Sequence, residues 1–108
     1  MDSTTGAFER TLVESADPEF VLRLYVAGTN SRSLNVVDRV TRMCERHLAD
    51  RYELRVVDIY QHPTLAEEAQ VIAVPNLVRL LPAPVRRIVG DMADEERTLR
   101  AIGVAGSG

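Results

Sequence analysis

The first long apolar run of the chain covers residues 20–27 and ends at Gly28. A nearly continuous run of this length, bounded by turn residues, predicts a strand that is buried on both faces. After the turn, apolar residues recur every three or four positions, which is the spacing of an amphipathic helix, and Ser33 is its expected N-cap. The apolar positions of this helix are Leu34, Val37, Val40, Cys44 and Leu48.

A second strand is predicted at residues 52–60, because aliphatic and β-branched residues dominate that segment. A strand, a helix and a second strand joined in this way predict a parallel pair with a right-handed crossover, since the twist of the sheet favours that hand. The first half of the chain is therefore expected to be a βαβ unit.

The second half has a less regular pattern. Thr64 and Glu67 have the spacing of a capping box and predict a helix that runs to about Gln70. Residues 71–81 fit a strand, a helix or both, because their apolar run has no clean period and Pro75 interrupts it. Pattern alone leaves this segment undecided.

The last third of the chain contains a rigid Pro-Ala-Pro connector at residues 82–84, followed by a short strand at residues 85–89. Acidic residues at 94–96 mark the first turn of a final helix, which ends at Gly103. The predicted order is βαβαββα, an α/β domain with the thioredoxin layout. The final helix is shorter than an isolated helix needs for stability, so its conformation depends on what it packs against.

With 108 residues the chain has room for one hydrophobic core. We expect one domain at residues 20–103, between a flexible N-terminal arm at residues 1–19 and a flexible tail at residues 104–108.

Composition narrows the class of partner. The formal net charge is −3 and the basic residues form no block, which argues against nucleic acid. All thirteen basic residues are Arg, whose forked donors suit carboxylates on a protein surface. The single cysteine excludes an intramolecular disulfide, and there is neither a signal-peptide pattern nor an apolar stretch of membrane-spanning length. We therefore expect a soluble cytoplasmic protein with no membrane partner.

Thiol redox chemistry is the first enzyme class to consider, because the thioredoxin fold often has a cis-proline beside its active site and Val74-Pro75 suits that place. Such an enzyme needs a thiolate at the N-terminus of the first helix, where amide groups and the helix dipole lower its pKa. Residues 29–33 contain no cysteine. Cys44 lies three turns further along, on the apolar face, so we interpret it as a buried apolar residue.

The glutathione-binding half of a transferase is a second enzyme class, since it shares the Val-Pro-x-Leu element at residues 74–77. Tyr25 or Ser31 would then activate a bound thiol. We disfavour this class because the all-helical second domain of such enzymes is not expected in this chain.

Metal and acid–base sites are not supported either. His47 and His62 do not complete any zinc-ligand spacing with the lone cysteine. Asp58, at the end of a strand, has no evident titrating partner, so we interpret it as a structural carboxylate. We expect no catalytic residue, no metal site and no cofactor.

Four segments of the sequence together resemble the KaiB family in their order and spacing. They are VLRLYVAG at residues 21–28, VVD at 56–58, PTLAEE at 63–68 and PAPVRRIVGD at 82–91. The likeness runs from Phe20 to Gly103 without a gap, and the last two segments are not general features of thioredoxins. The resemblance implies a non-enzymatic protein that docks on the hexameric ring of a KaiC-type ATPase and alters its output in a clock, timer or stress pathway.

The same resemblance implies a metamorphic fold, in which the second half adopts either a thioredoxin-like arrangement that binds the ATPase or a different packing found in a resting tetramer. The family usually has a third proline where this chain has Ala83, and a Gly-Leu-Asp pattern where this chain has residues 101–103 (Ala-Ile-Gly). Because Ala favours a helix over Gly by about 1 kcal/mol, we expect the thioredoxin-like state to be more populated here than in a typical relative, an effect that Gly103 partly offsets. The implied fold-switch residues are Pro75, Pro82, Ala83, Pro84, Ala101 and Gly103.

The implied partner face includes the end of the second strand and the helix after it, with arginines as charge complements. Its implied contact residues are Tyr60, Gln61, His62, Glu67 and Gln70, with Arg55, Arg86 and Arg87. The alternative from another class is a thioredoxin-like adaptor or sensory domain that binds a signalling histidine kinase or another protein. A KaiA-like protein as a further partner, and a homo-oligomer such as a dimer or tetramer, are also left open.

Overall fold

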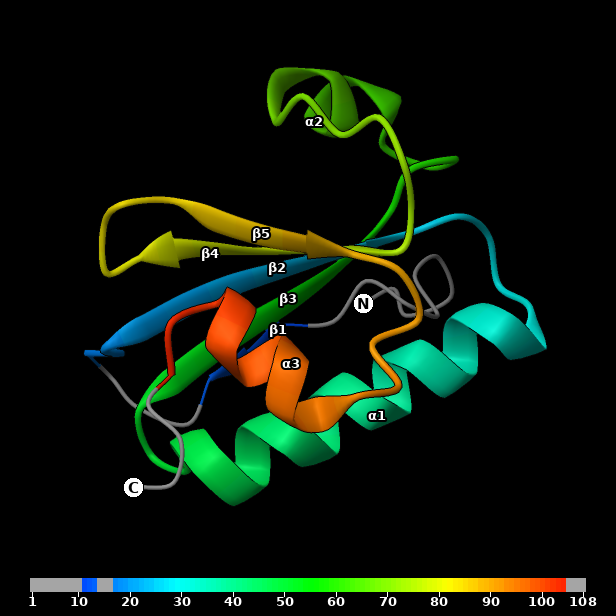
Figure 1. Cartoon of the computed structure of the whole chain (residues 1–108). Coiled ribbons are helices and arrows are strands. Elements are labelled where there is room, and N and C mark those ends of the chain that lie inside the picture. Colours follow the sequence, from blue (N-terminus) through cyan, green and yellow to red (C-terminus); the bar gives the residue numbers. More distant parts are fainter. Residues whose placement is uncertain (1–10, 14–16, 105–108) are drawn as a thin grey trace.

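Five strands form one mixed sheet with the spatial order β1-β3-β2-β4-β5 in the computed structural model, which describes residues 11–13 and 17–104 (Figure 1). The strands are β1 (Thr11–Val13), β2 (Phe20–Val26), β3 (Tyr52–Asp58), β4 (Asn76–Leu81) and β5 (Arg86–Val89). The central pair β2 and β3 is parallel, and the three outer pairings are antiparallel. The predicted βαβ unit and the thioredoxin-like α/β class are confirmed.

Three helices in the described part of the chain cover the sheet unequally: α1 (Ser31–Leu48), α2 (Pro63–Glu68) and α3 (Glu95–Ala101). Figure 1 shows α1 and α3 against one face and α2 over the other, near one end of the strands. The larger apolar core lies under α1 and α3, and a smaller cluster centred on Tyr25, Val57 and Val78 lies under α2. The α2 face is therefore the less covered one.

Alternation along the strands sends successive side chains to opposite faces. In β2, Leu22 and Leu24 join the larger core, whereas Tyr25 joins the smaller cluster. Arg23 has the same parity as Tyr25 and is half-buried on the α2 face. The nearly continuous apolar run of β2 thus has one face that packs closely and one face that carries the charge of Arg23.

Helix α1 begins at Ser31, three residues before the start that an N-cap at Ser33 predicts. Its N-cap is Asn30, whose side-chain oxygen accepts a hydrogen bond of 2.9 Å from the Ser33 amide. Val37, Val40, Cys44 and Leu48 are buried as predicted, but Leu34 is 54% exposed. Asn and Ser are both good N-caps, so local preference did not decide between them.

Helix α2 starts without the predicted capping box. His62 is the N-cap residue and makes no side-chain cap bond, and Pro63 occupies the first turn, where a missing N–H is harmless. Thr64 therefore lies inside the helix. The helix ends at Glu68, two residues before the expected Gln70, which has a positive φ of 59°.

The undecided segment at residues 71–81 resolves into a loop and a strand. The Val74–Pro75 peptide is cis, as expected for this fold, and β4 begins at the next residue, Asn76. Strand β4 pairs with β2 on one side and β5 on the other, so pairing with two distant segments decides its conformation. The last helix is confirmed, with Asp94 as its N-cap accepting from the Arg97 amide at 3.0 Å.

Parts of the expected arm and tail are ordered. Thr11–Val13 pair antiparallel with β3 as the edge strand β1, although the sequence favoured a flexible arm there. Val104, expected in the tail, is 8% exposed, and its amide donates to the Leu99 carbonyl at 2.9 Å. Residues 1–10, 14–16 and 105–108 lie outside the described residues. Within the described ranges, no helix is long and apolar enough to cross a membrane.

Candidate protein-binding face

Strand register places three arginines in one row across the α2 face of the sheet. Arg55 of β3 is paired with Arg23 of β2, and Arg23 is paired in turn with Val78 of β4. Val78 is paired with Arg87 of β5. Side chains opposite one another in a sheet share a face, so these residues form a continuous band.

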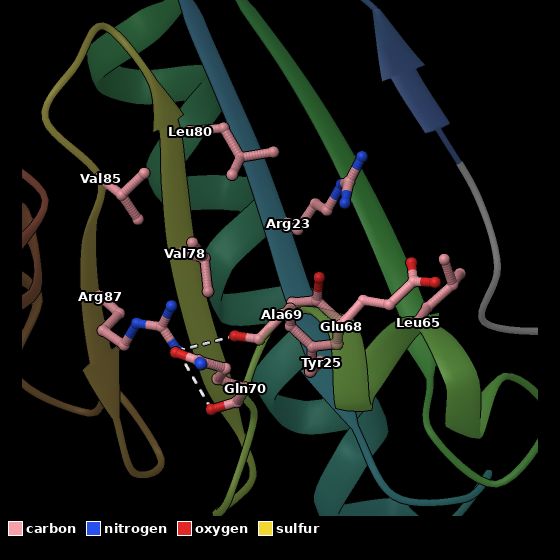
Figure 2. Close-up of a pocket in the computed structure, with 10 residues that line it drawn as sticks. All are labelled: Arg23, Tyr25, Leu65, Glu68, Ala69, Gln70, Val78, Leu80, Val85 and Arg87. Carbon is pink, nitrogen blue, oxygen red and sulfur yellow. Dashed lines mark hydrogen bonds between the residues drawn. The ribbon is translucent and has the colours of Figure 1, made fainter.

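The band borders a hollow of about 280 Å³, because α2 covers only part of this face. Tyr25, Val78 and Leu80 form its apolar floor. Figure 2 shows Arg23 and Arg87 on either side of this floor. The remaining residues of the hollow are Leu65, Glu68, Ala69 and Gln70 from the α2 side and Val85 from the β4–β5 turn.

The three arginines of the band differ in their hydrogen-bond partners. Arg87 donates to the backbone carbonyls of Ala69 and Gln70 at 3.2 and 3.5 Å, just beyond the last turn of α2 (Figure 2). A cation is favourable at that end of a helix. Arg23 and Arg55 make no hydrogen bond or ion pair with any residue that the structure describes. Their donors are available to a carboxylate from outside.

The β3–α2 turn forms an exposed corner next to this band. Buried Asp58 accepts hydrogen bonds from the Tyr60 amide at 2.9 Å and from the Gln61 side chain at 3.3 Å. Tyr60 is nevertheless 73% exposed, and its ring passes 3.3 Å from where a Cβ would stand at Gly28. An aromatic ring held outward by a buried carboxylate is well suited to contact a protein.

Most of the contact residues expected from sequence lie on this side of the molecule. Gln61, Glu67 and Gln70 are exposed, and His62 is half-buried with its amide bonded to the Asp58 carbonyl. Arg55 and Arg87 share the face described above.

Arg86 is the exception among the expected contact residues. It is paired with Arg79 of β4, and Arg79 projects to the α3 side of the sheet. Adjacent strand residues point to opposite faces, so Arg86 and Arg87 cannot contact one partner surface in the same way. The structure therefore places Arg86 on the opposite side of the sheet from Arg55 and Arg87, outside the arginine band.

Sequence reasoning missed Arg23 and Ile72. Arg23 is the only charged residue within β2, and a charge inside an apolar run was a signal that one face of that strand is open. Ile72 is 95% exposed in the loop between α2 and β4. Only the loss of regular structure at residues 69–75 revealed its exposure.

The position that holds the reactive cysteine in thiol enzymes has no thiol here. A shallow hollow of about 160 Å³ at the start of α1 is lined by Asn30, Arg32, Ser33 and Pro75, with Ala27 and Val74. Cys44 is fully buried, and burial followed by the charge of Glu45 raises the pKa of its thiol to about 12. A thiol in that state is a poor nucleophile.

The histidines have structural partners. His47 Nε2 lies 2.7 Å from Glu95 Oε2, a contact that joins α1 to α3. Among residues 11–13 and 17–104, no group of three His, Cys, Asp or Glu side chains is placed to hold a metal ion.

Comparison with known proteins identifies one family over most of the chain. The KaiB domain model matches residues 23–104. The circadian clock protein KaiB3 of a Synechocystis species is 35% identical over 88 residues, which cover 82% of this chain and 86% of that protein. The circadian clock oscillator protein KaiB of Prochlorococcus marinus is 39% identical over 85 residues, covering 79% of this chain and 81% of that protein.

Solved structures agree on the fold. The N-terminal domain of SasA from Synechococcus elongatus superposes with a TM-score of 0.65 at 22% identity, over 79% of this chain and 80% of that domain. A mutant thioredoxin from Halobacterium salinarum superposes with a TM-score of 0.59 at 18% identity, over 82% of this chain and 79% of that protein. Both chains share the thioredoxin-like fold with this protein.

Proposed function

This chain belongs to the KaiB family, and from that premise we propose that it is a clock-type regulatory protein that docks on the ring of a KaiC-type ATPase and performs no catalysis itself. The observation that carries the proposal is the family match over residues 23–104. That range includes every residue that lines the hollow on the α2 face, from Arg23 to Arg87, and the loops before and after α2.

The chemistry of the α2 face supports docking on a protein. An apolar floor beside guanidinium groups that have no acidic partner among the described residues fits a partner segment that presents carboxylates next to apolar side chains. Arg23 and Arg55 would form paired hydrogen bonds with such carboxylates, since the guanidinium fork matches their geometry. The corner at Tyr60, Gln61 and His62 would supply aromatic and polar contacts, with Glu67 and Gln70 extending them along α2.

We also propose that the second half of the chain has an alternative packing, as the family resemblance implies. The short α3 supports this, because seven residues cannot hold a helix without tertiary contacts. The residues expected to set the balance between the two states are Pro75, Pro82, Ala83, Pro84, Ala101 and Gly103. A dimer or tetramer would be the form that holds the alternative packing.

The test of the proposed function is size-exclusion chromatography with light scattering. The purified protein is run alone and then mixed with the KaiC-type ATPase of the same organism and ATP. Co-elution at the mass of a ring with bound subunits is the expected result. A monodisperse protein that never joins the ring would overturn the proposal.

A second candidate is an adaptor or sensory role, in which the same face binds a signalling histidine kinase, a KaiA-like protein or another partner. The fold that this chain shares with the SasA N-terminal domain supports this second candidate. The chromatography experiment separates the two candidates when the kinase replaces the ATPase in the mixture.

A further inference from the structure

Arg79 of β4 is a buried cation on the α3 side of the sheet, opposite the face described above. Arg79 is only 5% exposed. No carboxylate among the described residues pairs with it; its two terminal nitrogens donate to backbone carbonyls instead. One bond runs to the Ile102 oxygen at 2.8 Å and the other to the Pro84 oxygen at 2.7 Å.

The Ile102 carbonyl lies at the C-terminal end of α3, where Ile102 is the C-cap residue. Carbonyls at that end carry partial negative charge and lack partners inside the helix. The Arg79 guanidinium supplies both the missing donor and a favourable charge. Burial, and next the repulsion of Arg86, lowers the pKa of Arg79. The two carbonyls therefore stabilise a guanidinium charge whose surroundings otherwise disfavour it.

Gly103 adapts the chain to this contact. Its φ is +77°, and a Cβ added there would overlap the Nη1 atom of Arg79. A larger residue at this position would displace the guanidinium. The end of α3 and the side chain of Arg79 are therefore fitted to one another.

The second bond of Arg79 reaches the turn between β4 and β5. Pro84, which accepts it, is followed directly by Val85, and Val85 lines the hollow on the opposite face. Arg87, two residues further, is the arginine that holds the end of α2. One side chain thus connects α3 on one face with a wall of the hollow on the other.

We propose that Arg79 is a positioning residue, which couples the docking of α3 to the shape of the hollow and thereby sets the affinity of the α2 face for its protein partner. The affinity part rests on the proposed function; the coupling part does not. When α3 leaves the sheet, the Pro84 carbonyl loses the donor that α3 helps to hold in place, and the wall at Val85 becomes free to move.

Hydrogen–deuterium exchange of the free protein tests the coupling. Arg79→Lys keeps the charge but cannot donate to both carbonyls in the planar geometry of a guanidinium, and Arg79→Met removes all donors. In both variants we expect the backbone amides of residues 95–104 and of residues 82–89 to exchange at least about tenfold faster than in the unmodified protein. The amides of the β2–β3 ladder should keep their protection. Arg86→Met is the matched control, because Arg86 is exposed and makes none of these bonds; it should leave both segments protected.

Gly103→Ala provides a second route if Arg79→Met fails to fold. It retains the arginine but displaces its guanidinium, so both segments should again lose protection together. Faster exchange in residues 95–104 alone, or in neither segment, in the folded variants would overturn the coupling.

The affinity part is tested with the KaiC-type ATPase ring. Arg79→Lys is expected to bind at least about tenfold more weakly, although it alters no residue of the α2 face, whereas Arg86→Met binds like the unmodified protein. Unchanged affinity together with joint loss of protection would reject the link to binding. If the unmodified protein does not bind the ring, the proposed function fails, and the exchange result still decides the coupling.

Discussion

The carboxylate of Asp58 accepts a hydrogen bond of 3.0 Å from the backbone amide of Gly28, thirty residues earlier in the chain. The same oxygen accepts from the Tyr60 amide at 2.9 Å. Asp58 therefore holds the ends of β2 and β3 together and directs the turn that carries Tyr60. It is a structural carboxylate, as the sequence indicated, and its position explains how the exposed corner keeps its shape.

Removing that carboxylate should destabilise the fold. Asp58→Ala leaves two part-buried amides without an acceptor, and we expect a loss of about 2 kcal/mol in the free energy of unfolding. Asp58→Asn keeps one oxygen for both amides and should cost clearly less. Urea unfolding followed by circular dichroism measures both, and equal midpoints for Asp58→Ala and the unmodified protein would contradict the assignment.

The arginine band should matter for binding in a face-specific way. Arg55→Ala combined with Arg87→Ala removes two cations from the α2 face, and we expect ring binding to weaken by about tenfold or more. Arg86→Ala is the control, since it removes one arginine charge from the opposite face. Titration calorimetry at two salt concentrations measures the effect, and a loss with Arg86→Ala as large as with the double variant would refute the face assignment.

Acid should weaken the contact between α1 and α3. Hydrogen bonds from His47 and then Arg46 lower the pKa of Glu95. A lowered folded-state pKa means that the stabilisation is complete above the ordinary glutamate value of about 4.3 and is lost as the pH falls through the lower folded value.

Thermal melting at a series of pH values measures this effect. The melting temperature of the unmodified protein should fall more steeply below about pH 4.3 than that of Glu95→Gln, which cannot lose a charge there. Parallel pH curves for the two proteins would exclude the contribution of Glu95. Glu96→Gln serves as the control, because Glu96 is largely exposed and its ion pair with Arg100 is 4.0 Å long.

Cys44 should be inert in the folded protein. Its thiol has a pKa of about 12 and is buried, so alkylation by iodoacetamide at neutral pH requires opening of the core. We expect stoichiometric labelling in denaturing urea and almost none in native buffer, measured by mass spectrometry. Rapid native labelling would show that the helix leaves the sheet far more often than this packing allows.

The last residue of α3 provides a test of helical preference. Ala101→Gly should destabilise the docked helix by about 1 kcal/mol, which corresponds to about fivefold faster exchange of the Ile102 and Val104 amides. NMR measurements of amide hydrogen exchange on the free protein give this ratio of rates. A free protein whose residues 94–102 form a strand would refute the expectation that the thioredoxin-like state is favoured here.

Local signals were sufficient for the first half of the fold. The apolar run before Gly28 and the three-to-four-residue spacing from Val37 to Leu48 each specify one conformation, and a crossover of this length has one favoured hand. The order of elements and the absence of a thiol at the start of α1 followed directly. The expected contact residues around Tyr60 came from the family likeness and not from these local signals.

Pairing between distant segments decided the rest. Whether Arg86 or Arg87 faces α2 depends on the register of β5 against β4, and a shift of one residue would exchange them. The strand character of Asn76–Leu81 comes from its two neighbours in the sheet, and the edge strand at Thr11–Val13 comes from β3.

By itself, the sequence determined the α/β class, the βαβ unit and the buried cysteine, because each depends on residue type and spacing over a few turns or strands. Only the tertiary structure decided that Arg23, Arg55 and Arg87 share a face, that Arg79 is buried between α3 and a turn, and that Asn30 begins α1. These relationships depend on strand register and on which backbone carbonyls lack a hydrogen-bond donor in the folded chain. Neither can be read from a short segment of sequence.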